Sequence, residues 1–403
     1  MFSYAPYNKA MDEKLPNLPV KGRGAISNPP VRFDRLSTER VDDGWARPAV
    51  PAPSTRTRIG TRELGPGLAR SVASGDAPSI PQEDELPPLR TIVTPDASRS
   101  VLVRQTSPDI PFDRSINPYR GCEHGCVYCF ARPTHAYLGL SPGLDFETRL
   151  TAKLDAAKLL EEELRRPGYR PAPVALGTNT DPYQPIEREY RIMRGILEVL
   201  SAFNHPVTIV TKSNLVTRDI DLLAPMARKK LARVALSVTT LEPEVARAME
   251  PRAPIPGRRL AAIRSLASAG IPVSVMAAPM IPGLNDWELE RILEAAAHAG
   301  ATGAGYILLR MPHEIKDLFT EWLETHFPGR AKHVLSLMRQ SRGGKLYDAE
   351  WGKRFKGEGK IAETLGLRFR LAIKRLGLNK GGWRLDTTQF AAPLRAGDQM
   401  RLL

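Results

Sequence analysis

The sequence is short of cysteine: its 403 residues contain three, all within eight positions, at Cys122, Cys126 and Cys129. An odd number of thiols this close together is not a disulfide framework, which would spread pairs of cysteines along the chain. The sequence also lacks any run of about 18 apolar residues, and residues 1–10 lack the apolar core of a signal peptide. We therefore expect a cytoplasmic protein with reduced thiols, no transmembrane helix and no membrane partner.

Acidic residues are scarce near the C-terminus. The chain has a formal net charge of +14, and residues 327–403 hold 17 Lys and Arg against 6 Asp and Glu. A basic segment of this kind suits a nucleic-acid backbone or another anionic partner. It is also typical of a solvated basic surface, so charge alone leaves nucleic acid as a candidate partner.

Periodic apolar faces are missing from residues 1–88, which are rich in Pro, Gly, Ser and Arg. A stretch such as 48–53, with the sequence PAVPAP, buries too little apolar surface to offset the entropy of ordering. We predict a largely disordered extension over 1–88, a core domain over 89–312, and a basic, mainly helical extension over 313–403.

Short apolar runs alternate with amphipathic segments through the core domain. Strands are expected at 115–118, 174–176, 207–210, 234–238, 271–276 and 306–309. Helices are expected at 145–166, 187–203, 218–230, 242–249, 257–269 and 286–299, and in the C-terminal extension at 314–326, 331–339 and 360–376. This alternation predicts an α/β fold built from parallel βαβ units.

The three cysteines lie on one glycine-flanked loop, residues 121–130, with the spacing C-x3-C-x2-C. Three thiolates on a short loop suit an iron–sulfur cluster or zinc. A [4Fe–4S] cluster held by three cysteines keeps one iron open to a further ligand. The alternative is a structural zinc site with His124 or His135 as fourth ligand, although such sites usually draw their ligands from two separated pairs.

This loop, with Tyr128 before its third cysteine, resembles the signature loop of the radical S-adenosylmethionine (SAM) superfamily. The wider stretch 117–132 resembles the spore photoproduct lyase-like, or DNA-repair-photolyase-like, branch. The resemblance implies a partial (β/α)6 TIM-type barrel, a [4Fe–4S] cluster on the three cysteines, and SAM on the open iron. It also implies an enzyme that cleaves SAM reductively to a 5′-deoxyadenosyl radical, using a flavodoxin- or ferredoxin-type reductant.

Polar residues follow the expected strands, and the active site of a parallel βα barrel lies at the carboxyl ends of its strands. By resemblance, the loop after strand 174–176 receives the amino group of SAM, and the next two strand ends contact its ribose and carboxylate. The residues that we expect to bind SAM are Tyr128, Thr178, Asn179, Asp181, Lys212, Ser237, Thr239, Arg252 and Leu309. Turn formation, helix capping and surface ion pairs are the structural alternatives.

A fourth cysteine is absent from the chain. Spore photoproduct lyase uses a cysteine outside the cluster loop to return a hydrogen atom to its product radical. Repair of a thymine lesion here would need another donor, for which Tyr137, Tyr183 and Tyr306 are candidates. The substrate stays open, and we expect the extension from residue 313 to act as a lid. The alternative functions are a non-catalytic nucleic-acid-binding protein with a structural zinc or iron–sulfur site, and an iron–sulfur sensor.

Overall fold

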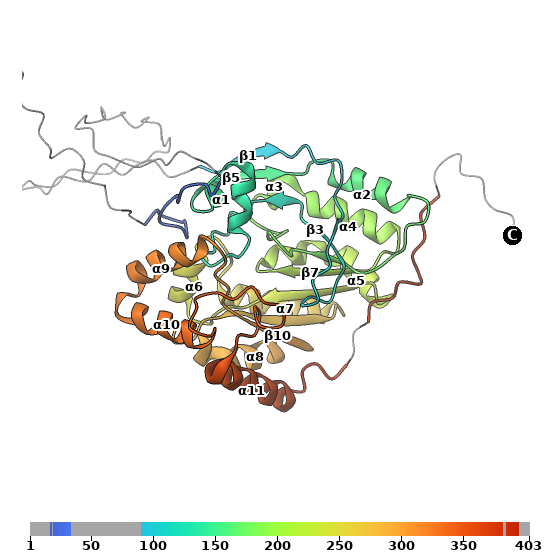
Figure 1. Ribbon diagram of the computed structural model, residues 1–403. Helices are drawn as coiled ribbons and strands as arrows, with labels where there is room; N and C mark the ends of the chain where they lie inside the picture. Colours follow the sequence, from blue (N-terminus) through green and yellow to red (C-terminus); the bar gives the residue numbers. More distant parts are fainter. Residues whose placement is uncertain (1–16, 18, 34–89, 382–383, 395–403) are drawn as a thin grey trace, which may run out of the picture. The chain divides into compact units, whose positions relative to one another are not determined.

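The computed structural model describes residues 17, 19–33, 90–381 and 384–394, all within one compact unit of the chain (Figure 1). Most of the predicted N-terminal extension therefore lies outside the described residues. Within them, no helix is both long and apolar enough to cross a lipid bilayer.

The core is a seven-stranded sheet in the order β10-β9-β8-β7-β6-β3-β2. Its six parallel strands are β3 (Arg114–Ile116), β6 (Val174–Leu176), β7 (Val207–Thr211), β8 (Ala232–Ser237), β9 (Val273–Met280) and β10 (Gly303–Leu308). The short strand β2 (Val103–Arg104) is antiparallel to β3. Strands β10 and β2 are the two edges of this sheet, so the sheet does not close on itself. The predicted partial (β/α)6 barrel is therefore confirmed.

Helices connect the parallel strands and cover the sheet (Figure 1). They are α2 (Ala156–Leu164), α3 (Glu187–Tyr190), α4 (Ile192–Ala202), α5 (Ile220–Arg228), α6 (Pro243–Met249), α7 (Pro256–Ser268) and α8 (Leu289–His298), with 3-10 turns η2 (Arg132–Leu138), η3 (Asn214–Asp219) and η4 (Asp286–Glu288). Strands such as β6 are buried along their whole length, which is why they read as short apolar runs.

The single helix predicted over 145–166 is wrong. Helix α1 (Asp145–Thr148) is followed by strand β5 (Arg149–Ala152), and only then by α2. Strand β5 pairs with β1 (Ile92–Pro95) on one side and with β4 (Tyr119–Arg120) on the other. Leu150 and Ala152 are buried while Arg149 is exposed, so tertiary pairing and an alternating face override the helical pattern of this segment.

Described residues of the N-terminal extension pack on this unit. Arg23 donates to the Glu147 carbonyl oxygen over 2.9 Å, and the N–H groups of Gly24 and Ala25 donate to the Glu147 carboxylate. The Ser27 hydroxyl donates to Glu321 over 2.6 Å. Residues 19–33 therefore join α1 to the C-terminal extension.

The C-terminal extension contains α9 (Ile315–His326), α10 (Pro328–Gln340) and α11 (Gly359–Leu376), which confirms the helices predicted there. Trp322 of α9 donates from its indole nitrogen to the Ala248 carbonyl oxygen at the end of α6. Leu365 and Ala372 of α11 belong to the same hydrophobic core as the barrel strands. The extension is thus packed against the barrel through both ends.

Residues 341–358, which we call the seam segment, connect α10 to α11 across the open side of the barrel. The Leu308 N–H group of β10 donates to the Phe355 carbonyl oxygen over 2.8 Å. On the other side, the Gly352 N–H group and the Arg354 guanidinium donate to Asp109, which lies between β2 and β3. The seam segment therefore bridges the two edges that the sheet does not close itself.

Candidate active site

The cysteine loop, residues 121–130, directly follows β4 and is fixed by neighbouring backbone. The Cys122 N–H group donates to the Phe146 carbonyl oxygen over 2.9 Å, and that of Val127 to the Met249 carbonyl oxygen over 3.1 Å. Gly125 has φ +67°, and a Cβ there would lie 2.7 Å from Glu147 Oε2. The loop therefore needs glycine at this turn both for its backbone angle and for space.

A fully buried ion pair between Arg132 and Glu147 holds the loop from below. Arg132 also donates to the carbonyl oxygens of Cys126 over 2.9 Å and Gly125 over 3.2 Å, and to two further carbonyl oxygens beyond the loop. A buried ion pair is stable when its remaining donors and acceptors are satisfied, as they are here. This pair fixes the positions of two cysteine-loop carbonyls and thereby the path between the thiols.

The three cysteines line one cavity of about 200 Å³ together with the carboxyl ends of the parallel strands. We call it the cysteine cavity. Of the residues expected to bind SAM, those that line it are Tyr128, Asn179, Asp181, Lys212, Ser237 and Leu309. These residues come from the cysteine loop and from the ends of β6, β7, β8 and β10, so the structure brings most of the predicted set to one place.

Three of the expected residues lie outside the cavity lining. Thr178 accepts a hydrogen bond from Asn117 through its hydroxyl, and Thr239 is fully buried beneath the cavity. Arg252 pairs with Glu123 over 3.2 Å and donates from its backbone to the His124 carbonyl oxygen. Their positions suit a supporting role for the loop and the cavity floor.

The carboxylate of Glu250 is the centre of a buried network that sequence inspection missed. It accepts from the Tyr128 hydroxyl, from the Thr239 hydroxyl over 2.6 Å, and from Arg259. Burial alone would raise the pKa of Glu250, but the positive charges of Arg259 and Lys212 outweigh burial and lower the pKa to about 2. Glu250 lies two residues before Arg252, so the right segment was identified, but not the residue that points inward.

Lys212 lies on the floor of the cavity, at the end of β7. Its Nζ is 3.9 Å from Glu250 Oε1 and 5.6 Å from the centre of the Tyr128 ring. Burial lowers the pKa of Lys212, but the charge of Glu250 and other anions raises it above its ordinary value. The ammonium group is therefore held charged inside the cavity.

Asp181 joins the loop after β6 to the end of β7. It accepts from the Thr211 hydroxyl and from the Lys212 N–H group, each over 2.7 Å, and faces His124 Nδ1 at 3.4 Å. Burial raises the pKa of Asp181, while His124 and these hydrogen bonds lower it to about 2. The cavity therefore contains a fixed carboxylate as well as a fixed ammonium group.

The thiols fit an iron–sulfur cluster better than a single zinc ion. Burial raises the pKa of all three, that of Cys126 to about 12, so a soft cation is needed to keep them ionised. In the described part of the chain, no three His, Cys, Asp or Glu side chains gather around one ion position. A cluster binds each thiolate to a different iron. For His135, one of the two histidines considered as a fourth zinc ligand, Nε2 lies 2.9 Å from the Arg149 carbonyl oxygen and the ring packs against Phe146.

The tyrosines considered as hydrogen donors do not line the cysteine cavity. Tyr183 is fully buried and donates to Asp219, while Tyr306 packs on Phe369. Tyr137 is 72% exposed and packs against Phe33. Among the described lining residues, the tyrosine that reaches the cavity is Tyr128.

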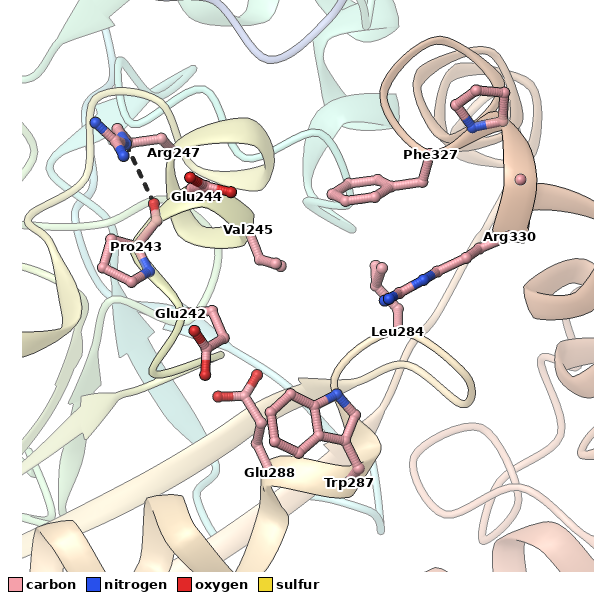
Figure 2. A pocket seen from close by; sticks show the side chains of 12 residues that line it. Glu242, Pro243, Glu244, Val245, Arg247, Leu284, Trp287, Glu288, Phe327 and Arg330 are labelled. Atoms are coloured by element: carbon pink, nitrogen blue, oxygen red, sulfur yellow. Dashed lines mark hydrogen bonds between the residues drawn. The ribbon is translucent and has the colours of Figure 1, made fainter.

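A larger cavity, of about 750 Å³, lies elsewhere (Figure 2). Its walls come from α6, from η4 and from the start of α10, with Glu242 and Arg247 on one side and Phe327 and Arg330 on the other. Glu288, at its base, already accepts from Thr240 and from the Leu241 N–H group. Its described lining has no cysteine and no residue from the ends of β6 or β7. The larger of the two cavities is therefore not the one that contains the candidate active-site residues.

Comparison with known proteins gives relatives in bacteria, archaea and a virus. A protein of Mycobacterium tuberculosis (strain ATCC 25618 / H37Rv), described as uncharacterized, is 42% identical over 233 residues, or 57% of this chain and 68% of the relative. One of Acidianus two-tailed virus is 30% identical over 60% of this chain and 77% of the relative. One of Methanocaldococcus jannaschii is 27% identical over 43% of this chain and 62% of the relative.

Solved structures of spore photoproduct lyase share the fold. The complex with dinucleoside spore photoproduct has a TM-score of 0.51 at 18% identity, over 71% of this chain and 80% of that chain. A double mutant with bound AdoMet and dinucleoside spore photoproduct has a TM-score of 0.52 at 18% identity, over 75% of this chain and 86% of that chain. The radical SAM superfamily description matches residues 116–296, from the end of β3 into α8. The fold and the cysteine loop agree with this match, and this chain belongs to the radical SAM superfamily.

Proposed function

We propose that this enzyme holds one [4Fe–4S] cluster on Cys122, Cys126 and Cys129 and cleaves SAM reductively in the cysteine cavity. The superfamily uses this cluster with SAM and needs a reductant. The observation that carries the proposal is the convergence of three cysteine thiols, a fixed ammonium group and a fixed carboxylate on one cavity at the strand ends.

Different residues of the cavity bind different parts of SAM. Lys212 supplies a cation for the carboxylate of SAM, and Asp181 with Asn179 supplies acceptors for its amino group. Ser237 offers a hydroxyl to the ribose, and Leu309 an apolar surface to the adenine. When bound and reduced, the cluster supplies the electron that cleaves SAM to methionine and a 5′-deoxyadenosyl radical.

Residues around these keep the site in shape and exclude water from it. The Arg132–Glu147 pair fixes the cysteine loop, and Glu250 fixes Tyr128 and Lys212 at the floor. Apolar side chains of β9 and β10, among them Met276 and Leu308, form part of the wall. A rigid, largely apolar cavity excludes water from a reactive radical.

We include nucleic acid in the proposal as the substrate class. The fold likeness to spore photoproduct lyase and the basic C-terminal residues support it. Since the chain has no fourth cysteine, its hydrogen donor differs from that expected for a spore photoproduct lyase. A flavodoxin- or ferredoxin-type reductant and a cytoplasmic location, where thiolates stay reduced, complete the proposal.

Anaerobic reconstitution with iron and sulfide tests this function. The reconstituted chain is reduced with dithionite in the presence of SAM, and 5′-deoxyadenosine is followed by chromatography. We expect product from the native chain and none from the Cys126→Ala variant. Stoichiometric zinc in place of iron, with no product and no SAM binding, would instead identify a binding protein with a metal-stabilised loop.

A further inference from the structure

Arg310 follows β10 and lies at the opening of the cysteine cavity. Its guanidinium carbon is 4.9 Å from the centre of the Phe130 ring and 4.7 Å from that of Phe355. Phe130 directly follows Cys129, and Phe355 belongs to the seam segment. The cluster loop and the C-terminal extension therefore meet across this one arginine.

The guanidinium of Arg310 packs on two aromatic rings and forms no ion pair within the part of the chain that the structure describes. Its buried Nε has no hydrogen-bond acceptor there. Contact with aromatic rings leaves the in-plane N–H donors of a guanidinium free to bind an oxyanion. The arginine is thus oriented by its surroundings without being neutralised by them.

A second arginine, Arg342 of the seam segment, adds positive charge behind the first. It is 1% exposed and donates to the Leu309 carbonyl oxygen over 2.6 Å, while its Nε and Nη1 are buried without an acceptor. Burial and the charge of Arg310 lower the pKa of Arg342 to about 10, although Tyr347 and Asp348 act in the opposite direction. Two guanidinium groups with buried N–H donors that lack acceptors therefore lie at this wall of the opening.

We propose that Arg310 binds a phosphodiester oxygen of a single-stranded nucleotide substrate, and that Phe130 stacks on a neighbouring base. Phe130 is 42% exposed although it directly follows a cluster ligand. Cationic groups beside exposed aromatic rings are the usual platform for single-stranded nucleic acid. This inference rests on the proposed function, and it assigns the substrate's phosphate to a particular residue.

The carboxylate of SAM is the competing oxyanion. Lys212 already provides a cation on the cavity floor, next to Tyr128 of the cysteine loop. SAM must reach an iron held by the cysteines, whereas Arg310 lies beside Phe130 and Phe355 at the outer end. The positions therefore favour Lys212 for SAM and Arg310 for the substrate.

The test uses the reconstituted full chain with two probes, dithymidine phosphate and its uncharged methylphosphonate analogue, and measures their dissociation constants by calorimetry. We expect the native chain to bind the charged probe about tenfold more tightly, the scale of one hydrogen-bonded charge contact. Arg310→Gln should bind both probes alike, and Arg310→Lys should discriminate to an intermediate degree, because it keeps the charge without the fork.

Arg291→Gln is the matched control, because Arg291 also stacks on an aromatic ring, that of Trp287, but pairs with Glu242 and does not line the cysteine cavity. It should discriminate as the native chain does. Equal affinity of the native chain for the two probes, or no binding of either, would overturn the proposal. So would native-like discrimination by Arg310→Gln.

A parallel titration with SAM separates the two oxyanions. If Arg310→Gln weakened SAM binding about tenfold while the discrimination between probes persisted, Arg310 would serve SAM and the inference would be wrong. Probe binding requires neither reduction nor cleavage. Failure of the proposed function, seen as absent 5′-deoxyadenosine from the native chain, is therefore recorded independently.

Discussion

The two ends of the cysteine cavity differ in whether their charged side chains are paired. Around the cysteine loop, Arg132 is paired with Glu147, and Glu250 with Arg259, in both cases fully buried. At the opening, Arg310 and Arg342 keep buried N–H groups without acceptors among the described residues. Paired charges suit a cofactor that occupies one fixed place, whereas unpaired donors suit a ligand that enters and leaves.

Replacing one arginine at each end should produce the largest contrast. Arg132→Met leaves the buried Glu147 carboxylate without its partner and should lower the free energy of unfolding by about 3–5 kcal/mol. Arg310→Met leaves no carboxylate unpaired and should lower the free energy of unfolding by less than about 1 kcal/mol. Urea denaturation of both variants measures this. Similar losses would show that the opening is as rigidly paired as the loop.

Acid should weaken the loop end selectively. The pKa of Glu250 and that of Asp181 are lowered to about 2 in the folded chain, from 4.5 and 3.8. The unfolded chain then binds more protons, so their stabilisation is complete above about pH 5 and is lost as the pH falls towards 2, on the order of 2–3 kcal/mol each. Denaturation of the apoprotein at a series of pH values should show this slope, and Glu250→Gln should flatten it. An unchanged slope would rule out Glu250 as its source.

Two glycines with similar backbone angles distinguish the packed loop from an open turn. Gly125 has φ +67° with Glu147 Oε2 in the way of a Cβ, whereas Gly139 has φ +68° with nothing within 4 Å. Gly139→Ala should cost about 1 kcal/mol for the backbone angle alone, and Gly125→Ala about 2 kcal/mol more. Thermal unfolding of the two variants gives the difference. Equal costs would mean that the loop has room to shift.

The smallest effect is expected from Tyr128→Phe, which removes one hydroxyl from Glu250 while Thr239 and Arg259 remain. The free energy of unfolding should fall by about 1 kcal/mol. SAM affinity should fall less than in Lys212→Gln, which removes the cation itself. Equilibrium dialysis with SAM ranks the two variants, and the reverse order would contradict the role given to Lys212.

The sequence predicted the parts of the site that are encoded locally. The cysteine spacing lies within eight residues, and the buried parallel strands appear as short apolar runs, so the loop and the six-stranded barrel could be recognised. Strand β5 could not, because its partner β1 begins 57 residues earlier, at Ile92. A short apolar segment that also fits the period of a helix cannot be recognised as a strand when its partner strand is distant in the sequence.

The electrostatic parts of the site were beyond the sequence for a similar reason. Lys212, Asp181 and Ser237 could be placed at strand ends, but whether a side chain after the strand points inward depends on the loop path, as Glu250 and Arg252 show. The lack of an acceptor for Arg310 is a property of its surroundings, which come from the cysteine loop and from the seam segment. Only the folded chain reveals it.

The central claim is that three cysteines hold a cluster with one iron open to SAM. Electron paramagnetic resonance of the dithionite-reduced chain, recorded with and without saturating SAM, tests it most directly. The account predicts a [4Fe–4S] signal that SAM changes in the native chain and that is absent from Cys126→Ala. A native chain without that signal, or with a signal that SAM leaves unchanged, would contradict it.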